Sequence, residues 1–185
     1  MYTASDLRKG LRLKIDGDPY VITEFNFVKP GKGQALYRTK LKNMINGNQF
    51  ERTFRSVDNF EPADLREKKM QYLYKDGDLY YFMDNETFEN IPINSETLGD
   101  SFKFVKENTN CRVLSYKGVV FGVEPPVFVE LVVSKTDPGF KGDTATNASK
   151  PATLETDAEI RVPLFINEGD LIRVDTRTGE YLERA

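Results

Sequence analysis

The chain has 185 residues, with 26 Lys and Arg, 29 Asp and Glu, no His and a net charge of −3. Because His is absent and Cys111 is the single cysteine, the sequence excludes Ser-His-Asp and Cys-His catalysis, imidazole metal ligands and a thiolate zinc site. No run approaches the ~18 apolar residues of a membrane span and no signal peptide is recognisable, so we expect a cytoplasmic protein. An enzyme would have to use carboxylate or lysine chemistry, and because no candidate pair of such residues is found, we expect the protein not to be an enzyme and to hold no cofactor or metal.

The basic residues are unevenly distributed along the chain. Residues 1–55 hold 11 Lys and Arg against 5 Asp and Glu, whereas residues 56–185 hold 15 against 24. A polyanion such as RNA would therefore bind the N-terminal part, although the whole chain is acidic. The alternative is a chance imbalance of charge.

Residues 1–63 are expected to form a small SH3-like (KOW-like) barrel. Apolar residues alternate with polar ones in a long strand over residues 20–27 and in a return strand over residues 36–44. Asn46-Gly47 is typical of a hairpin turn, and residues 50–57 form the next strand.

The turn between the first two of these strands, residues 28–35, has an unusual composition. Pro30 fixes its own φ, while Gly31 and Gly33 can adopt positive φ. Lys32 lies between the two glycines, so its ammonium is predicted to project from the end of the hairpin. One interpretation is an ordinary solvated lysine, and the other is a probe that reaches into another molecule. The stretch matches neither a P-loop nor a dinucleotide-binding motif.

The return strand carries a row of basic side chains. Tyr37, Thr39 and Leu41 share one face of it, because side chains alternate along a strand. The opposite face, which leads away from Lys32, can contact RNA phosphates or can be a solvated or edge-protecting face. Its basic residues are Arg38, Lys40 and Lys42.

Residues 64–127 are expected to form an OB-like barrel of five short strands and one helix. The helix is predicted over residues 95–107, with Asp100 as a suitable N-cap. Aromatic residues within 72–82 are predicted to serve core or interdomain packing rather than base stacking. Residues 61–64 and the pair Pro125-Pro126 mark the predicted domain borders.

Residues 128–185 are expected to form a second OB-like barrel. Apolar strands are predicted over residues 127–133, 160–165, 171–175 and 180–183. Residues 134–151 form a long loop rich in Gly, Thr, Asp and Lys, of a length that predicts function or mobility.

Six segments in chain order resemble bacterial translation elongation factor P, and together they span essentially the whole chain. The first resembles the tip of that family's first domain, the next two its second domain and the last three its third. The segments are residues 28–35, 72–77, 83–89, 136–144, 162–165 and 174–181.

The resemblance implies an L-shaped protein of three small barrels, of which the last two are OB folds, and a working monomer. It implies binding to the ribosome between the peptidyl and exit sites, with ribosomal RNA and peptidyl-tRNA as partners. There the family stimulates peptide-bond formation at consecutive prolines by positioning the peptidyl-tRNA, while the ribosome performs the chemistry.

The resemblance also implies roles for individual residues. Lys32 matches the lysine that a dedicated enzyme extends with a β-lysyl or an aminopentanol group. Within the resemblance, Gln34 weakly favours β-lysylation. Residues 144–150 replace a glycine-rich loop near the exit-site codon, and this departure leaves their individual RNA contacts open. The loop that presents Lys32 is formed by Lys29, Pro30, Gly31, Gly33 and Gln34. The implied RNA-binding residues are Arg38, Lys40, Lys42, Thr146, Asn147, Tyr181 and Arg184.

Three alternatives from the sequence remain open, of which enzyme activity is the weakest. A paralogue of elongation factor P could act on a different stalled substrate. A free-standing OB-type RNA-binding protein would use the same barrels and basic charge, but it would give the Lys32 hairpin no role.

Overall fold

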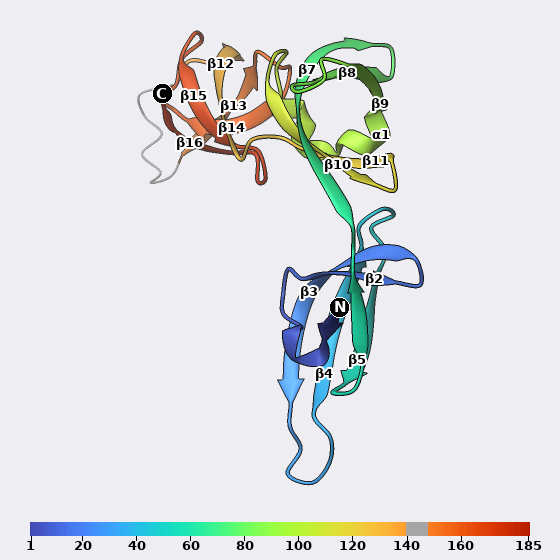
Figure 1. Cartoon of the computed structure of the whole chain (residues 1–185). Helices are drawn as coiled ribbons and strands as arrows, with labels where there is room; N and C mark the ends of the chain where they lie inside the picture. The colour runs from blue at the N-terminus through green and yellow to red at the C-terminus, as the bar shows by residue number, and fades with distance from the viewer. Residues whose placement is uncertain (140–147) are drawn as a thin grey trace. The chain divides into compact units, whose positions relative to one another are not determined.

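The computed structural model describes residues 1–139 and 148–185, and within them the strands form three antiparallel sheets (Figure 1). The prediction of a mainly β protein is confirmed. The chain divides into two compact units. Unit 1 comprises residues 1–66 and 115–121, and unit 2 comprises residues 67–114 and 122–185. The domain borders predicted from the sequence stay predictions.

Unit 1 is built on a six-stranded sheet in the order β1-β6-β2-β3-β4-β5. Its core is lined by Leu13, Ile22, Leu41, Phe54 and Phe60, all buried. These side chains alternate with polar ones along their strands, which is why each strand buries a single face. The elements are β1 (Tyr2–Thr3), the 3-10 helix η1 (Ala4–Asp6), β2 (Arg12–Ile15), β3 (Asp18–Val28), β4 (Leu36–Asn43), β5 (Gln49–Arg55) and β6 (Asn59–Pro62).

A later segment of the chain, residues 115–121, completes unit 1. Tyr116 is buried, and its hydroxyl donates a hydrogen bond of 2.8 Å to the backbone carbonyl of Gly17. Gly17 lies in the tight turn between β2 and β3. The aromatic residue therefore fixes this turn from a distant point in the sequence.

Two five-stranded sheets follow. The first has the strand order β11-β10-β7-β8-β9 and the second the order β14-β13-β12-β15-β16. The strands of the first are β7 (Leu65–Asp76), β8 (Leu79–Asp84), β9 (Asn90–Asn94), β10 (Asn110–Tyr116) and β11 (Val119–Glu124). Those of the second are β12 (Phe128–Thr136), β13 (Ser149–Leu154), β14 (Glu159–Pro163), β15 (Leu171–Asp175) and β16 (Glu180–Arg184).

The helix predicted over residues 95–107 is wrong in length. The structure has a single α-turn, α1 (Ser95–Leu98), and a 3-10 helix, η2 (Asp100–Phe104). Gly99 separates them with φ +74°, a value that no right-handed helix contains. Asp100 is consequently the first residue of η2 and not a helix N-cap. The break allows Phe104 to pack into the core of the sheet β12–β16.

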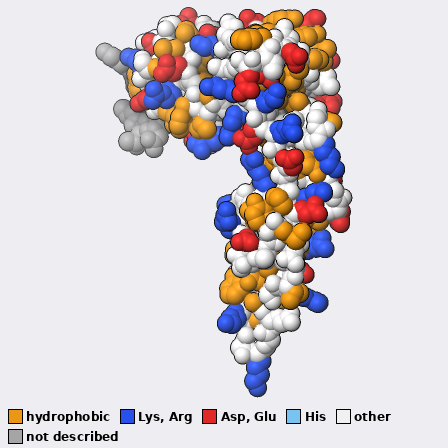
Figure 2. Space-filling model, in the orientation of Figure 1, with side chains coloured by type: hydrophobic (Ala, Val, Ile, Leu, Met, Phe, Trp, Pro, Cys, Tyr) orange, Lys and Arg blue, Asp and Glu red, His pale blue; other side chains and the backbone are white. Residues whose placement is uncertain are grey.

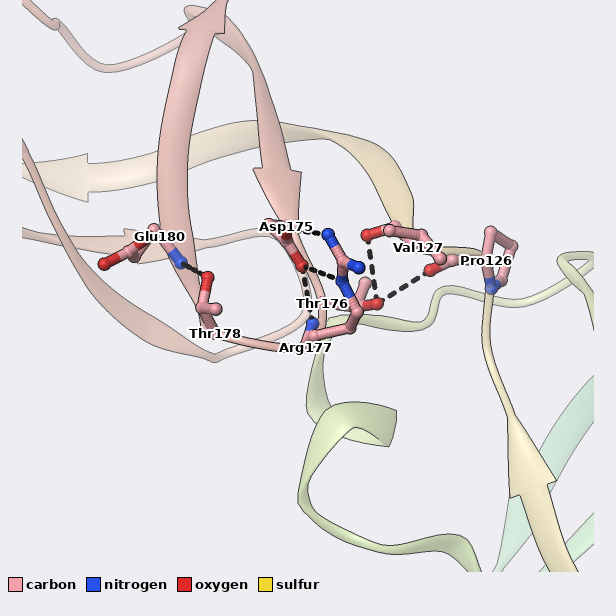
Figure 3. A network of polar contacts seen from close by, with 7 residues as sticks. All are labelled: Pro126, Val127, Asp175, Thr176, Arg177, Thr178 and Glu180. Atoms are coloured by element: carbon pink, nitrogen blue, oxygen red, sulfur yellow. Dashed lines mark hydrogen bonds and ion pairs between the residues drawn. The ribbon is translucent and has the colours of Figure 1, made fainter. Parts of the chain in front are cut away.

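The turn between β15 and β16 is hydrogen-bonded to the segment that precedes β12 (Figure 3). The Thr176 hydroxyl donates to the carbonyls of Pro126 and Val127 at 2.7 and 3.1 Å. Asp175 accepts two hydrogen bonds from the guanidinium of Arg177, at 3.1 and 2.8 Å, and this pairing lowers the pKa of the Asp175 carboxyl. A buried Thr and a fork-shaped ion pair thus hold the turn in one conformation.

The turn between β8 and β9 is organised by a buried carboxylate. Asp84 Oδ1 accepts the backbone N–H groups of Glu86 and Thr87 at 2.8 and 3.3 Å. Its other oxygen, Oδ2, accepts a hydrogen bond from Lys68 Nζ at 2.7 Å. The hydrogen bond from Lys68 and those from the backbone hold the pKa of Asp84 down to about 2. The charged form of Asp84 is therefore part of the folded state.

Asp84→Asn tests this contribution through pH. The amide oxygen still accepts the two backbone bonds, whereas the ion pair with Lys68 is lost. Because the folded-state pKa lies below the ordinary value of 3.8, the extra stability of the wild type is present above pH ~4 and is lost as the pH falls toward ~2. Thermal melts of both proteins between pH 2 and 7 should converge at the acid end. A constant difference in melting temperature would contradict the assignment.

Candidate functional site

The hairpin formed by β3 and β4 projects as a long arm of unit 1 (Figure 1). The two strands pair from Tyr20 and Asn43 to Val28 and Leu36, with one irregularity between Ile22 and Glu24. Beyond the last pair, residues 29–35 form the connecting loop. The paired arms place this loop at a fixed distance from the core of the unit.

Aromatic side chains stiffen the end of the arm next to the loop. The ring of Tyr37 lies 5.1 Å from that of Phe27 and 6.3 Å from that of Phe25. Tyr37 also stands opposite Phe54 on β5, whose ring packs edge-on against Phe60 at 4.6 Å. Aromatic pairs at such distances stabilise a sheet beyond the area that they bury. The base of the loop is therefore connected to the core of unit 1 by continuous packing.

The loop presents Lys32 to solvent as the sequence predicted. In the described part of the chain, Lys32 forms no hydrogen bond or ion pair, and it is exposed. Gly33 has φ +133°, and a Cβ placed on it would lie 3.5 Å from Pro30 Cγ. Of the two glycines that could adopt a positive φ in this loop, only Gly33 does so, because the φ of Gly31 is not positive. The remaining loop residues predicted as the presenting set, Lys29, Pro30, Gly31 and Gln34, are also exposed.

The basic row on β4 is less uniform than the sequence indicates. Lys40 is opposite Glu24 on β3 and Glu51 on β5, and its Nζ lies 3.3 Å from Glu24 Oε1. Arg38 and Lys42 stand opposite uncharged residues on both sides and have no ion pair among the described residues. Figure 2 shows a basic side chain at the tip of the hairpin. Within this row, Arg38 and Lys42 are thus the cations that an anion can approach without displacing a described carboxylate.

Two further candidates lie on β16 in unit 2. Tyr181 lines an open hollow of about 1040 Å³ together with Arg161 and Phe165. Arg184 donates to Asp170 Oδ2 at 2.9 Å and to the Phe165 carbonyl at 3.2 Å, and its guanidinium lies over the Phe165 ring. The exposed ring of Phe165 and the guanidinium of Arg161, which line this hollow with Tyr181, were not among the residues predicted from the sequence. The only signal for them was that Phe165 ends one of the segments with a family resemblance.

The other two predicted RNA-binding residues, Thr146 and Asn147, lie outside the described residues. The first described strand after them begins at Ser149, whose hydroxyl accepts a hydrogen bond of 2.8 Å from Arg161 Nε. Lys150 is buried, and its ammonium donates to the carbonyl of Asp137. The Lys150 side chain therefore joins Asp137 to the start of β13.

Two other kinds of site, a metal centre and a reactive thiol, have no support among the described residues. No group of three or more His, Cys, Asp or Glu among them could hold a metal ion. Cys111 is buried, and this burial raises the pKa of its thiol to about 12, which leaves it unreactive near neutral pH. No described helix has the length and hydropathy that a membrane crossing requires.

Comparison with known families assigns all three parts of the chain. The model of the elongation factor P KOW-like domain matches residues 3–60, that of the elongation factor P OB domain matches residues 65–123, and that of the elongation factor P C-terminal domain matches residues 129–184. The predicted combination of one KOW-like and two OB-like domains is confirmed.

Full-length relatives agree with these matches. Proteins named elongation factor P from Syntrophus aciditrophicus and Acetivibrio thermocellus are 62% and 58% identical over 184 residues, which cover 100% of this chain and 98% and 100% of theirs. A solved structure titled eukaryotic translation initiation factor 5A from Methanococcus jannaschii aligns with a TM-score of 0.53 at 22% identity, over 66% of this chain and 94% of that one. At this identity the likeness concerns the fold alone.

Proposed function

The chain belongs to the elongation factor P family of non-catalytic translation factors, and we propose that it binds the ribosome between the peptidyl and exit sites and stimulates peptide-bond formation at consecutive prolines. The observation that carries the proposal is the exposed Lys32 at the end of a braced hairpin. Proline is a stiff and slow nucleophile. Holding the peptidyl-tRNA in a reactive geometry can lower such a barrier by several kcal/mol (~7 or more in the best cases) without a catalytic group on the factor.

We assign to Lys32 the contact with the peptidyl-tRNA. Its ammonium can donate to phosphate oxygens and 2′-hydroxyls of the terminal nucleotides. A β-lysyl group attached by a modifying enzyme would extend this reach and keep a cation near the end, whereas an aminopentanol group would extend it with a hydroxyl. The exposure of residues 29–34 supports access of such an enzyme to Lys32, which forms no hydrogen bond or ion pair with any described residue.

The other cations would supply affinity for ribosomal RNA. Arg38 and Lys42 can approach phosphates directly, whereas Lys40 must first leave Glu24. In unit 2, Tyr181, Arg184 and the neighbouring Phe165 offer aromatic and guanidinium faces on which nucleotides can stack. A monomer acting in the cytoplasm is consistent with this mode of binding.

Salt dependence of ribosome binding tests the row on β4. The double variant Arg38→Gln with Lys42→Gln should bind more weakly, and the slope of log Kd against log salt should fall by about 2, because two fewer counterions are released. Lys40→Gln serves as the matched control and should change the slope much less, since Glu24 already neutralises this cation. An unchanged slope in the double variant would show that the row does not contact phosphates.

Lys32→Ala tests the proposed function itself. In a purified translation system with a three-proline message, it should fail to relieve the stall. Its free energy of unfolding should change by no more than ~0.5 kcal/mol, because the side chain is exposed. Lys32→Arg should not restore full activity, since a guanidinium is not a substrate for an amine-modifying enzyme. Full stall relief by Lys32→Ala at saturating concentration would refute the proposal, and a message without consecutive prolines controls for general translation.

A further inference from the structure

The turn between β8 and β9 holds Phe88 in an unfavourable backbone conformation and exposes its side chain to solvent. Phe88 has φ +61°, a left-handed conformation that is rare for bulky residues. Its side chain is also 71% exposed, so it gains little from packing. Gly or Asn at this position would satisfy the turn at a lower cost. A strained backbone that holds an aromatic side chain in solvent indicates a role outside the folded chain.

The conformation of Phe88 is firmly determined by its surroundings. Its backbone N–H donates to the carbonyl of Asp84 at 2.8 Å, and the Asp84 N–H donates to the carbonyl of Glu89 at 2.9 Å. The Asp84 carboxylate accepts the backbone N–H groups of Glu86 and Thr87. The side chain of Asn85 donates a hydrogen bond of 2.9 Å to the side chain of Asn110 on β10. The ring is therefore presented from a rigid turn, and little conformational entropy is lost when it binds.

The charges beside Phe88 narrow the choice of partner. Residues 84–89 contain three carboxylates and no cation. Lys68 pairs with Asp84, and Glu86 and Glu89, which precede and follow Phe88 in the sequence, are exposed. Two carboxylates repel an RNA backbone, which disfavours base stacking by Phe88. An apolar pocket with a basic rim on a protein is complementary to both the ring and the charges.

We propose that the β8–β9 turn is a protein-docking site, in which Phe88 enters an apolar pocket of a basic partner protein while Glu86 and Glu89 pair with cations at the rim of that pocket. The inference rests on the proposed function, because the partner sought is a protein of the ribosome. The turn would thus add a protein contact to the RNA contacts assigned to the cations of the chain.

Charge reversal tests the sign of the partner's surface. The double variant Glu86→Lys with Glu89→Lys should weaken binding to purified ribosomes, about tenfold, if the partner is basic. The same change at Asp76 and Asp78, in the turn at the other end of β8, alters net charge equally and should not weaken binding. Tighter binding by the Glu86 and Glu89 variant would indicate RNA and would overturn the inference, as would unchanged binding.

Phe88→Gly separates docking from folding. Glycine accepts the positive φ of this position, so the melting temperature should stay equal or rise, while ribosome binding should weaken about tenfold. A photo-crosslinking amino acid in place of Phe88 should then attach to a ribosomal protein near Lys or Arg residues. Attachment to ribosomal RNA, or undiminished binding by Phe88→Gly, would overturn the docking site. If the wild-type protein itself does not bind ribosomes, the proposed function fails as well.

Discussion

The cross-strand register of β3 and β4 is the constraint on which the functional end of the molecule depends. From Glu24 and Lys40 to Val28 and Leu36 the strands pair without interruption. A slip of one residue in β3 would move Phe25 and Phe27 to the face of the sheet opposite Tyr37, because side chains alternate between faces. The packing of Tyr37 against both phenylalanines opposes such a slip. Side chains that face the core thus determine where an exposed lysine stands.

The residues that stabilise the chain and the residues to which we assign functions are different sets. The cores contain Leu, Ile, Val and Phe side chains in alternating patterns, which satisfy ordinary rules of burial. Lys32 and Phe88 contribute little to these cores, and each occupies the tip of a turn that other residues hold. Gly33 stabilises the first of these turns by adopting a positive φ. Asp84 stabilises the second by accepting hydrogen bonds from backbone N–H groups. Substitution at the tips should therefore change binding more than folding.

The sequence predicted the hairpin and its lysine because alternation and turn composition are local signals. It did not predict the partner of Lys40, since the irregularity between Ile22 and Glu24 decides which side chain of β3 faces it. The helix was overestimated because Gly99 interrupts an otherwise suitable pattern with a positive φ. The hollow beside Tyr181 combines Arg161 and Phe165 from a distant strand and loop, and the strain at Phe88 depends on a ring of backbone hydrogen bonds. Local patterns do not contain such long-range information.

The length of the β3–β4 arms provides the most direct test of the claim that geometry, and not only charge, makes Lys32 effective. Repeating Asn26-Phe27 in β3 and Tyr37-Arg38 in β4 adds two residues to each arm, which preserves the alternation of faces and moves the loop outward by ~7 Å. Stall relief on a three-proline message, measured with the melting temperature and ribosome affinity of the same variant, decides the matter. The account predicts loss of stall relief while melting temperature is retained and affinity changes by only a few-fold. Stall relief equal to that of the wild type would contradict it.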